Sequence, residues 1–180
     1  MVNYYYLSIL VLAFLFSACN SNPQEIVQEN QPFFHTTDPS RLYFQNTRGH
    51  KYKSITQQDS RIDYYYLKAI DQEQLINPII ANNWLAEEAY ILLENSDPLD
   101  AKNYTIALVK EDQSDTLQIT LQQRTDNYDF CKMLYTKSKS GYTIDVLTKQ
   151  GQWHPIFENE KARGYFYEVM RDYLRLTEQI

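Results

Sequence analysis

The stretch Thr116-Leu-Gln-Ile-Thr-Leu-Gln122 decides the fold class. Its three apolar residues alternate strictly with polar ones. Successive side chains of a strand point to opposite faces, so this alternation predicts a strand with one buried and one solvated face, as is typical of antiparallel sheets. The apolar segment 104–109 precedes it across an acidic turn at 110–115, and the two segments therefore predict a hairpin.

Shorter segments on both sides of this hairpin also have strand patterns. Turn residues separate several of them, which favours hairpins between neighbours. The predicted strands are 41–45 and 50–55 around a turn at 46–49, then 61–67, then 128–136 and 142–147 around a turn at 137–141, and finally 152–157.

Two segments predict helices. Near the C-terminus, apolar residues recur at i, i+3, i+4, i+7 and i+8, which indicates an amphipathic helix that packs on the sheet. These residues are Phe166, Val169, Met170, Tyr173 and Leu174. Asn77-Pro78 resembles a helix start, with Asn as N-cap and Pro in the first turn, so a helix is predicted over 78–88 and a strand over 89–94.

Together these segments predict an α+β domain over residues 40–180. An antiparallel β-meander would carry one or two helices on one face, including the C-terminal amphipathic helix. The segment that remains after an export signal is removed is of ordinary single-domain size.

The N-terminus is an apolar segment of a different kind. Residues 7–18 form an uncharged run that is too short to span a bilayer but suits the core of an export signal. Residues 1–18 are therefore predicted to be a signal peptide. Residues 19–39, rich in Asn, Gln, Ser, Thr and Pro, predict a flexible tether.

The end of this run, Phe16-Ser-Ala-Cys19, resembles the lipobox of bacterial lipoproteins. The resemblance covers only residues 1–19, and no family is recognised for the domain. It implies that the Cys19 thiol receives a diacylglyceryl group and that the signal is cut just before Cys19. The membrane would then be a partner through the lipid anchor, in the cell envelope. Asn20 is not the Asp that retains some lipoproteins at the inner membrane, so the outer membrane is the expected location.

Two other interpretations of the N-terminus stay open. An ordinary secretory signal cut after Ala18 would leave Cys19 free to form a disulfide with Cys131, the other cysteine of the chain. An uncleaved membrane anchor is the second alternative. If Cys19 is acylated, Cys131 has no intrachain partner.

Composition and motifs exclude several functions. The chain has 17 Lys and Arg against 23 Asp and Glu, with no basic run, and this pattern does not favour nucleic-acid binding. Phosphate-loop and dinucleotide motifs are absent, as are HExxH, CxxC and GxSxG. The three histidines are not spaced as metal ligands. We therefore predict no catalytic residue, no metal site and no cofactor.

Aromatic residues supply the candidate contacts with a ligand or partner. Trp153 could offer a stacking surface beside His154. Tyr64, Tyr65 and Tyr66 are consecutive in a predicted strand, so Tyr65 must point away from the other two. Either both faces of this strand are covered or one of them meets a partner.

Three functional hypotheses follow. The first is a lipid-anchored envelope protein that acts as a binding or accessory module for another envelope component, either a protein or a saccharide or small ligand, through its sheet face or a Tyr-rich edge. The second is an envelope hydrolase that uses His154 with nearby carboxylates; it would need a cleft that places His154 within hydrogen-bond reach of Cys131, a Ser or an Asp. The third is an anchored inhibitor or immunity-type protein, with which the net charge of −6 is compatible.

Overall fold

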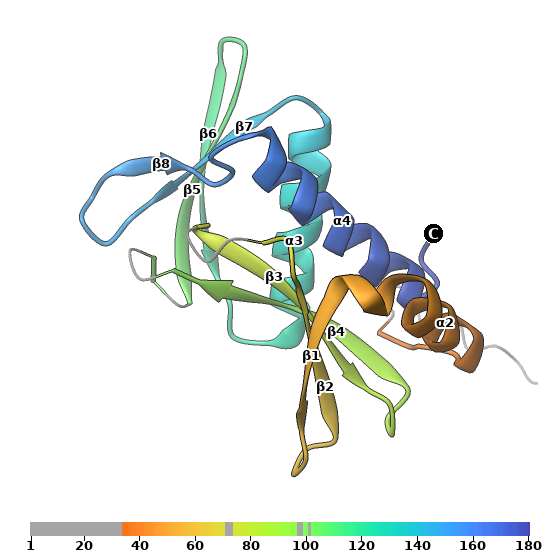
Figure 1. Ribbon diagram of the computed structural model, residues 1–180. Coiled ribbons are helices and arrows are strands. Elements are labelled where there is room, and N and C mark those ends of the chain that lie inside the picture. Colours follow the sequence, from red (N-terminus) through yellow and green to blue (C-terminus); the bar gives the residue numbers. More distant parts are fainter. Residues whose placement is uncertain (1–33, 71–73, 97–98, 101) are drawn as a thin grey trace, which may run out of the picture. The chain divides into compact units, whose positions relative to one another are not determined.

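The computed structural model describes residues 34–70, 74–96, 99–100 and 102–180 (Figure 1). These residues form two four-stranded antiparallel sheets and three α-helices, so the predicted α+β class with a β-meander is confirmed. The signal peptide, Cys19 and the tether up to residue 33 lie outside the described residues.

The first sheet is the meander. Its strands follow chain order as β1 (Tyr52–Gln57), β2 (Ile62–Leu67), β3 (Ile76–Asn83) and β4 (Glu88–Asn95). The end of the predicted tether lies beside β4, where the Thr36 N–H donates to the Glu87 carbonyl at 2.7 Å and the Ala89 N–H donates to the Phe34 carbonyl at 2.8 Å.

The second sheet has the order β6-β5-β7-β8. Its strands are β5 (Asn103–Lys110), β6 (Gln113–Thr120), β7 (Thr143–Leu147) and β8 (Trp153–Pro155). Helix α3 (Arg124–Lys139) connects β6 to β7, which places β7 on the other side of β5 from β6.

The β5–β6 hairpin confirms the strand prediction but not its buried face. Leu117 is 39% exposed, and no residue of β6 is fully buried. The reason is position: β6 is an edge strand, and the hairpin projects beyond the helices (Figure 1). Ile119 is partly buried against the core, and Leu121, just past the strand, is fully part of it.

The core lies between the sheets and the helices α3 and α4 (Glu160–Leu176). All five apolar residues predicted for the C-terminal helix are buried, so that helix is confirmed. It begins where the Asn159 side chain accepts a hydrogen bond from the Ala162 N–H at 2.9 Å. Its buried face packs on β3 and β4, against residues such as Ile80 and Ile91.

The strand predicted at 41–45 is wrong. Helix α2 (Asp38–Tyr43) and a π-helical turn (Phe44–Arg48) occupy this segment. A capping box forces the helix: the Thr37 side chain accepts from the Ser40 N–H, and the Ser40 side chain accepts from the Thr37 N–H. Phe44 is buried against the rings of Tyr52 and Tyr65.

The helix predicted at 78–88 is also wrong, because these residues belong to β3 and the turn that follows it. β3 lies between β2 and β4 and is buried on both faces, so its central residues 78–81 form a continuous apolar run without alternation. Pro78 is tolerated because it lies just past the last β2–β3 pair, Tyr66 with Ile79. The Leu67 carbonyl that would face it accepts from the Ile70 N–H at 3.1 Å instead.

The strand predicted at 128–136 and its turn at 137–141 are wrong as well, because α3 covers them. The buried residues Tyr128, Cys131, Leu134 and Ser138 are spaced three or four apart, as one face of a helix requires. Asp126 caps the helix start by accepting from two backbone N–H groups. The remaining predicted strands correspond to β1, β2, β4, β7 and β8.

Candidate functional site

The two faces of the meander differ in what covers them. One face packs on the helices through Tyr65, Ile80 and Ile91. The opposite face, which we call the aromatic face, has a buried centre and a half-buried or exposed margin. It consists of Ile55, Ile62, Tyr64, Tyr66, Ile79, Ala81, Tyr90 and Leu92.

The centre of the aromatic face is buried because Phe34 packs on it and Arg124 of α3 lies over the Tyr90 ring, and because its side chains pair across the strands. Ala81 pairs with Tyr64 on one side and Tyr90 on the other, so two rings flank a small side chain. Ile79 lies in the same way between Tyr66 and Leu92. At the margin, Ile55 on β1 remains 46% exposed. The margin of the aromatic face therefore leaves an apolar side chain accessible beside Tyr64 and Tyr66.

A groove of about 450 Å³ lies at one end of the aromatic face. Ile55 and Tyr66 supply its apolar wall, while the charged and amide groups come from Lys53, Asn77 and Glu94. Burial and then the Glu94 carboxylate raise the pKa of the Tyr66 hydroxyl, which keeps it a neutral hydrogen-bond donor.

Asn77 adds an unsatisfied acceptor to this groove. Its Oδ1 atom is buried and has no hydrogen-bond partner among the described residues. A buried carbonyl oxygen without a donor costs free energy, which a bound N–H or O–H group would recover. The groove can therefore hold a chain that offers an apolar side chain, a charged group and a hydrogen-bond donor.

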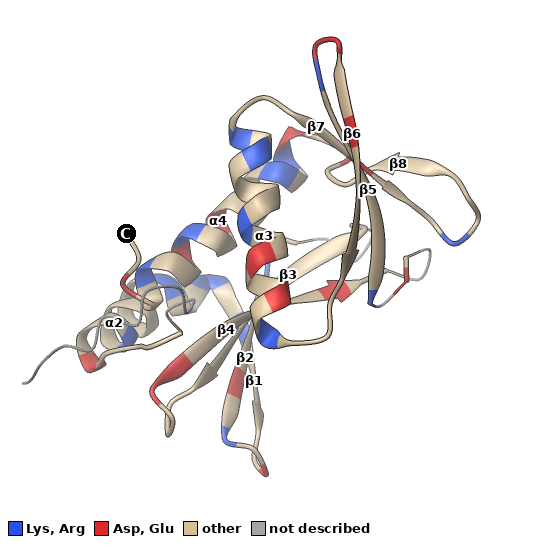
Figure 2. Cartoon of the chain, turned by 180° about the vertical axis from the view of Figure 1, so that it is seen from behind, with Lys and Arg blue, Asp and Glu red and all other residues tan. Residues whose placement is uncertain are grey.

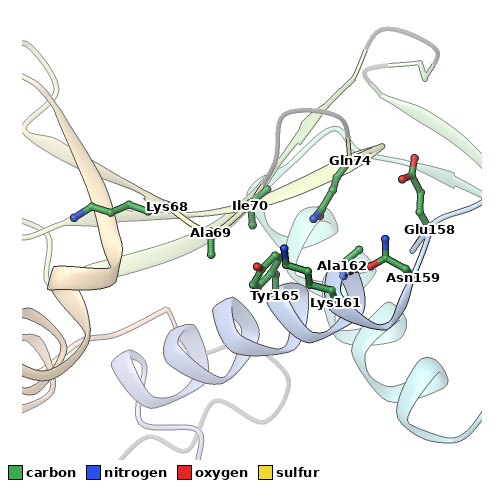
Figure 3. Close-up of a pocket in the computed structure, with 9 residues that line it drawn as sticks. All are labelled: Lys68, Ala69, Ile70, Gln74, Glu158, Asn159, Lys161, Ala162 and Tyr165. Carbon is green, nitrogen blue, oxygen red and sulfur yellow. Dashed lines mark hydrogen bonds between the residues drawn. The ribbon is translucent and has the colours of Figure 1, made fainter.

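A second cavity of about 420 Å³ lies between the segment after β2 and the start of α4 (Figure 3). Its polar groups are mostly committed to the fold. Asn159 caps α4, and the Lys161 ammonium lies 5.6 Å from the centre of the Tyr165 ring. Lys68 points away from the other lining residues (Figure 3), and its Nζ donates to the His50 carbonyl at 2.8 Å. We assign no ligand to this cavity.

The free edge of the meander lies beside the aromatic face. The Lys68 N–H donates to the Lys51 carbonyl at 3.0 Å, which fixes the alternation of hydrogen bonds along β1 and β2. Paired groups recur every second residue, so the N–H and C=O groups of Ser54 and Thr56 point to the unpaired edge. This edge of β1 can accept another strand.

The structure separates the tyrosines as the two-residue period predicts. Tyr64 and Tyr66 lie on the aromatic face, and Tyr65 lies in the core, with its ring centre 5.0 Å from that of Phe44. Lys53, Asn77 and Glu94 were not candidates from the sequence. Only the strand register brings them together, and the sequence pattern placed Asn77 at a helix start instead.

Trp153 and His154 lie apart from this groove, on the short edge strand β8. Both are exposed, and as neighbours in a strand they point to opposite faces. The His154 backbone pairs with Val146 of β7, but its imidazole forms no hydrogen bond with any residue that the structure describes. The arrangement that the hydrolase hypothesis needs is therefore not seen within the described ranges.

Cys131 is unsuited to nucleophilic chemistry in this fold. Its side chain is fully buried in α3, and burial raises the pKa of the thiol, so the reactive thiolate is disfavoured. The described part of the chain contains no cluster of three or more His, Cys, Asp or Glu that could hold a metal ion.

Comparison with known proteins gave no match: no protein-family model, no curated protein and no solved structure corresponds to this chain. Within the described ranges, no helix is long and apolar enough to cross a membrane.

Proposed function

We propose that this protein is a lipid-anchored binding module of the cell envelope, held at the outer membrane through Cys19. We further propose that its meander takes up an extended segment of another envelope protein along β1. The observation that supports this most directly is the unpaired edge of β1 beside an incompletely covered aromatic face.

The backbone of β1 would supply affinity without sequence preference. Ser54 and Thr56 present two N–H and two C=O groups to the edge, and an added strand can bond to each of them. Each such hydrogen bond contributes about 0.5–1.5 kcal/mol net. Four of them would supply a few kcal/mol before any side chain is counted.

The side chains would supply specificity. Every second residue of the added strand falls on the aromatic face, beside Ile55 and Lys53. An apolar residue there covers Ile55, and an acidic residue pairs with the Lys53 ammonium. A donor that reaches the groove satisfies the Asn77 Oδ1 atom.

A second long edge strand, β6, offers a comparison. The Leu121 N–H donates to the Lys102 carbonyl at 2.7 Å, so by alternation the backbone of Thr116 points to the free edge of β6. The residues of β6 form no face like that of the meander, and none of the main cavities lies against this strand.

Proline substitutions at these two edges test the proposal. Thr56→Pro removes one N–H from the free edge of β1 and leaves the backbone hydrogen bonds between β1 and β2 intact, although it also removes the exposed hydrogen bond from the Thr56 hydroxyl to Asp63. Thr116→Pro removes one N–H from the free edge of β6 in the same way. Each tagged full-length protein would be purified from detergent-solubilised membranes and its bound partner quantified. We expect loss of the partner with Thr56→Pro and retention with Thr116→Pro.

The intact mass of the purified protein tests the anchor separately. We expect the mass of a chain that starts at an acylated Cys19. An unmodified secreted chain with a Cys19–Cys131 disulfide and no bound partner would refute both parts of the proposal. If both proline variants retain the partner, the β1 edge is not the binding site. A captured toxin would favour the inhibitor hypothesis over the accessory one.

A further inference from the structure

A second surface of the domain carries unpaired positive charge. Lys132, Lys137 and Lys139 lie in the second half of α3, and Lys110 ends β5. None of these four lysines forms a salt bridge with a carboxylate in the described part of the chain. Figure 2 shows Lys and Arg gathered toward the end of α3, while Asp and Glu lie in its first half. We call the four lysines the basic patch.

Lysines of the basic patch lie against tyrosine rings in cation–π contacts. The ammonium groups of Lys110 and Lys137 lie 5.5 and 4.7 Å from the centre of the same Tyr142 ring. Lys139 lies 4.8 Å from the centre of the Tyr135 ring. Two like charges that share one ring repel each other, and an anion placed against both would relieve that repulsion.

The helix itself explains only part of this arrangement. Lys137 and Lys139 favourably oppose the negative end of the α3 dipole, which needs no ligand. Lys110 belongs to a different element and gains nothing from that dipole. Its approach to Tyr142 places a further cation beside the helix end, although the exposed carboxylates of Glu111 and Asp112 follow it in the turn of the hairpin.

The length of chain between the proposed anchor and the described residues limits how far the basic patch can lie from the membrane. If Cys19 is lipidated, the 15 residues from there to Phe34 can span at most about 50 Å. The Phe34 ring lies 6.1 Å from the Tyr128 ring, and the 11 residues from Tyr128 to Lys139 rise about 17 Å along α3. The segment between Cys19 and Phe34 is therefore long enough to let the basic patch touch the membrane that holds the anchor.

The distribution of charge over the domain favours one face for contact with that membrane. The chain carries a net charge of −6, so an anionic bilayer repels most of its surface. We propose that the basic patch docks on the anionic phospholipid headgroups of the membrane that holds the anchor, and so orients the domain. This proposal rests on the lipid anchor proposed above.

The test uses the mature lipidated protein bound to vesicles. Lysine acetylation rates would be measured residue by residue by mass spectrometry, on phosphatidylcholine vesicles with and without about 30% phosphatidylglycerol, at low salt and at about 0.5 M NaCl. Contact with an anionic surface is worth about 1 kcal/mol per lysine, or about fivefold in occupancy. We expect the four lysines of the basic patch to react about fivefold more slowly on anionic vesicles at low salt, and Lys102 and Lys149 to react at unchanged rates.

Charge variants complete the test. Lys137→Gln with Lys139→Gln should abolish the slower reaction of Lys110 and Lys132, and Lys102→Gln with Lys149→Gln should leave it unchanged. Equal rates on both kinds of vesicle would overturn the proposal. Protection in native envelope fragments but not on anionic vesicles would also overturn it and point to an acidic protein. A protein that does not bind even neutral vesicles would instead show that the anchor is missing.

Discussion

Asp172→Asn should destabilise the domain more than any comparable surface substitution. Asp172 lies in α4 and is buried, with only 3% of its surface exposed. Its carboxylate accepts two hydrogen bonds from the Arg48 Nε at 2.8 and 2.9 Å and one from the Tyr52 hydroxyl at 2.8 Å. These bonds join α4 to the segment that leads into β1, so they hold the binding edge on the core.

The expected loss of stability depends on which hydrogen bonds an asparagine at position 172 can still form. Its Oδ1 atom can still accept from Tyr52, and its shape is unchanged. The Arg48 guanidinium loses its most buried anionic partner but retains Glu168, 2.6 Å from its Nη2. Breaking a buried ion pair costs about 3–5 kcal/mol when the remaining charge has no partner. Because Glu168 remains, and because Lys51 also pairs with it at 2.6 Å, we expect about 2–3 kcal/mol.

Urea unfolding followed by circular dichroism measures this loss. A domain of this size should lose about 5–10 °C in Tm as well. The matched control is Asp129→Asn, since Asp129 is exposed on α3 and should change stability by at most about 0.5 kcal/mol. If Asp172→Asn costs no more than this control, the buried network contributes nothing and the reasoning is refuted. A combined Arg48→Met and Asp172→Leu variant should recover part of the loss.

The remaining predictions concern titration and thiol chemistry. Burial raises the pKa of Glu168, but hydrogen bonds from its cationic partners outweigh burial and lower it, so this carboxylate stabilises the fold above about pH 4.3. The free energy of unfolding should therefore fall as pH drops below that value in urea titrations, and a flat profile down to pH 3 would contradict this. Burial raises the pKa of Tyr52 and Tyr173, so the folded state should lose stability as pH rises past about 10, with their ionisation at 295 nm delayed until unfolding. Cys131 should not react with Ellman's reagent in the folded protein; unfolding should release one thiol per chain if Cys19 is acylated, whereas two would contradict the anchor.

Periodicity predicted the parts of the fold where one face is buried and the other is not. The C-terminal helix was readable because its apolar residues recur at helical spacing and all pack on the sheet. β3 was not readable, because a strand buried on both faces lacks alternation and Pro78 imitates a helix start. The α3 segment was ambiguous for another reason. Cys131, Met133 and Tyr135 alternate like a strand, although the burial of Cys131 and Leu134 follows a helical period.

Periodicity also predicted one part of the candidate site, the arrangement of its tyrosines, but not the groove. Two-residue periodicity alone separates Tyr64 and Tyr66 from Tyr65, whatever the rest of the fold does. The groove needs more than periodicity, because it depends on which residues of β3 and β4 lie opposite each other. Asn77 and Glu94 are 17 positions apart, and only correct strand assignments at both ends would have paired them.

The side chains along the open edge of β1 bear on which strands could pair with it. Natural sheets protect exposed edges with charges, and a lysine is among the commonest devices. On β1 that charge is Lys53, yet Ile55 two positions later remains exposed on the same face. A lysine beside an exposed apolar residue disfavours unselective pairing with apolar strands, because its ammonium would be buried without a partner. The same lysine favours a strand that carries a carboxylate at the matching position, so the β1 edge is better suited to one chosen partner than to self-association.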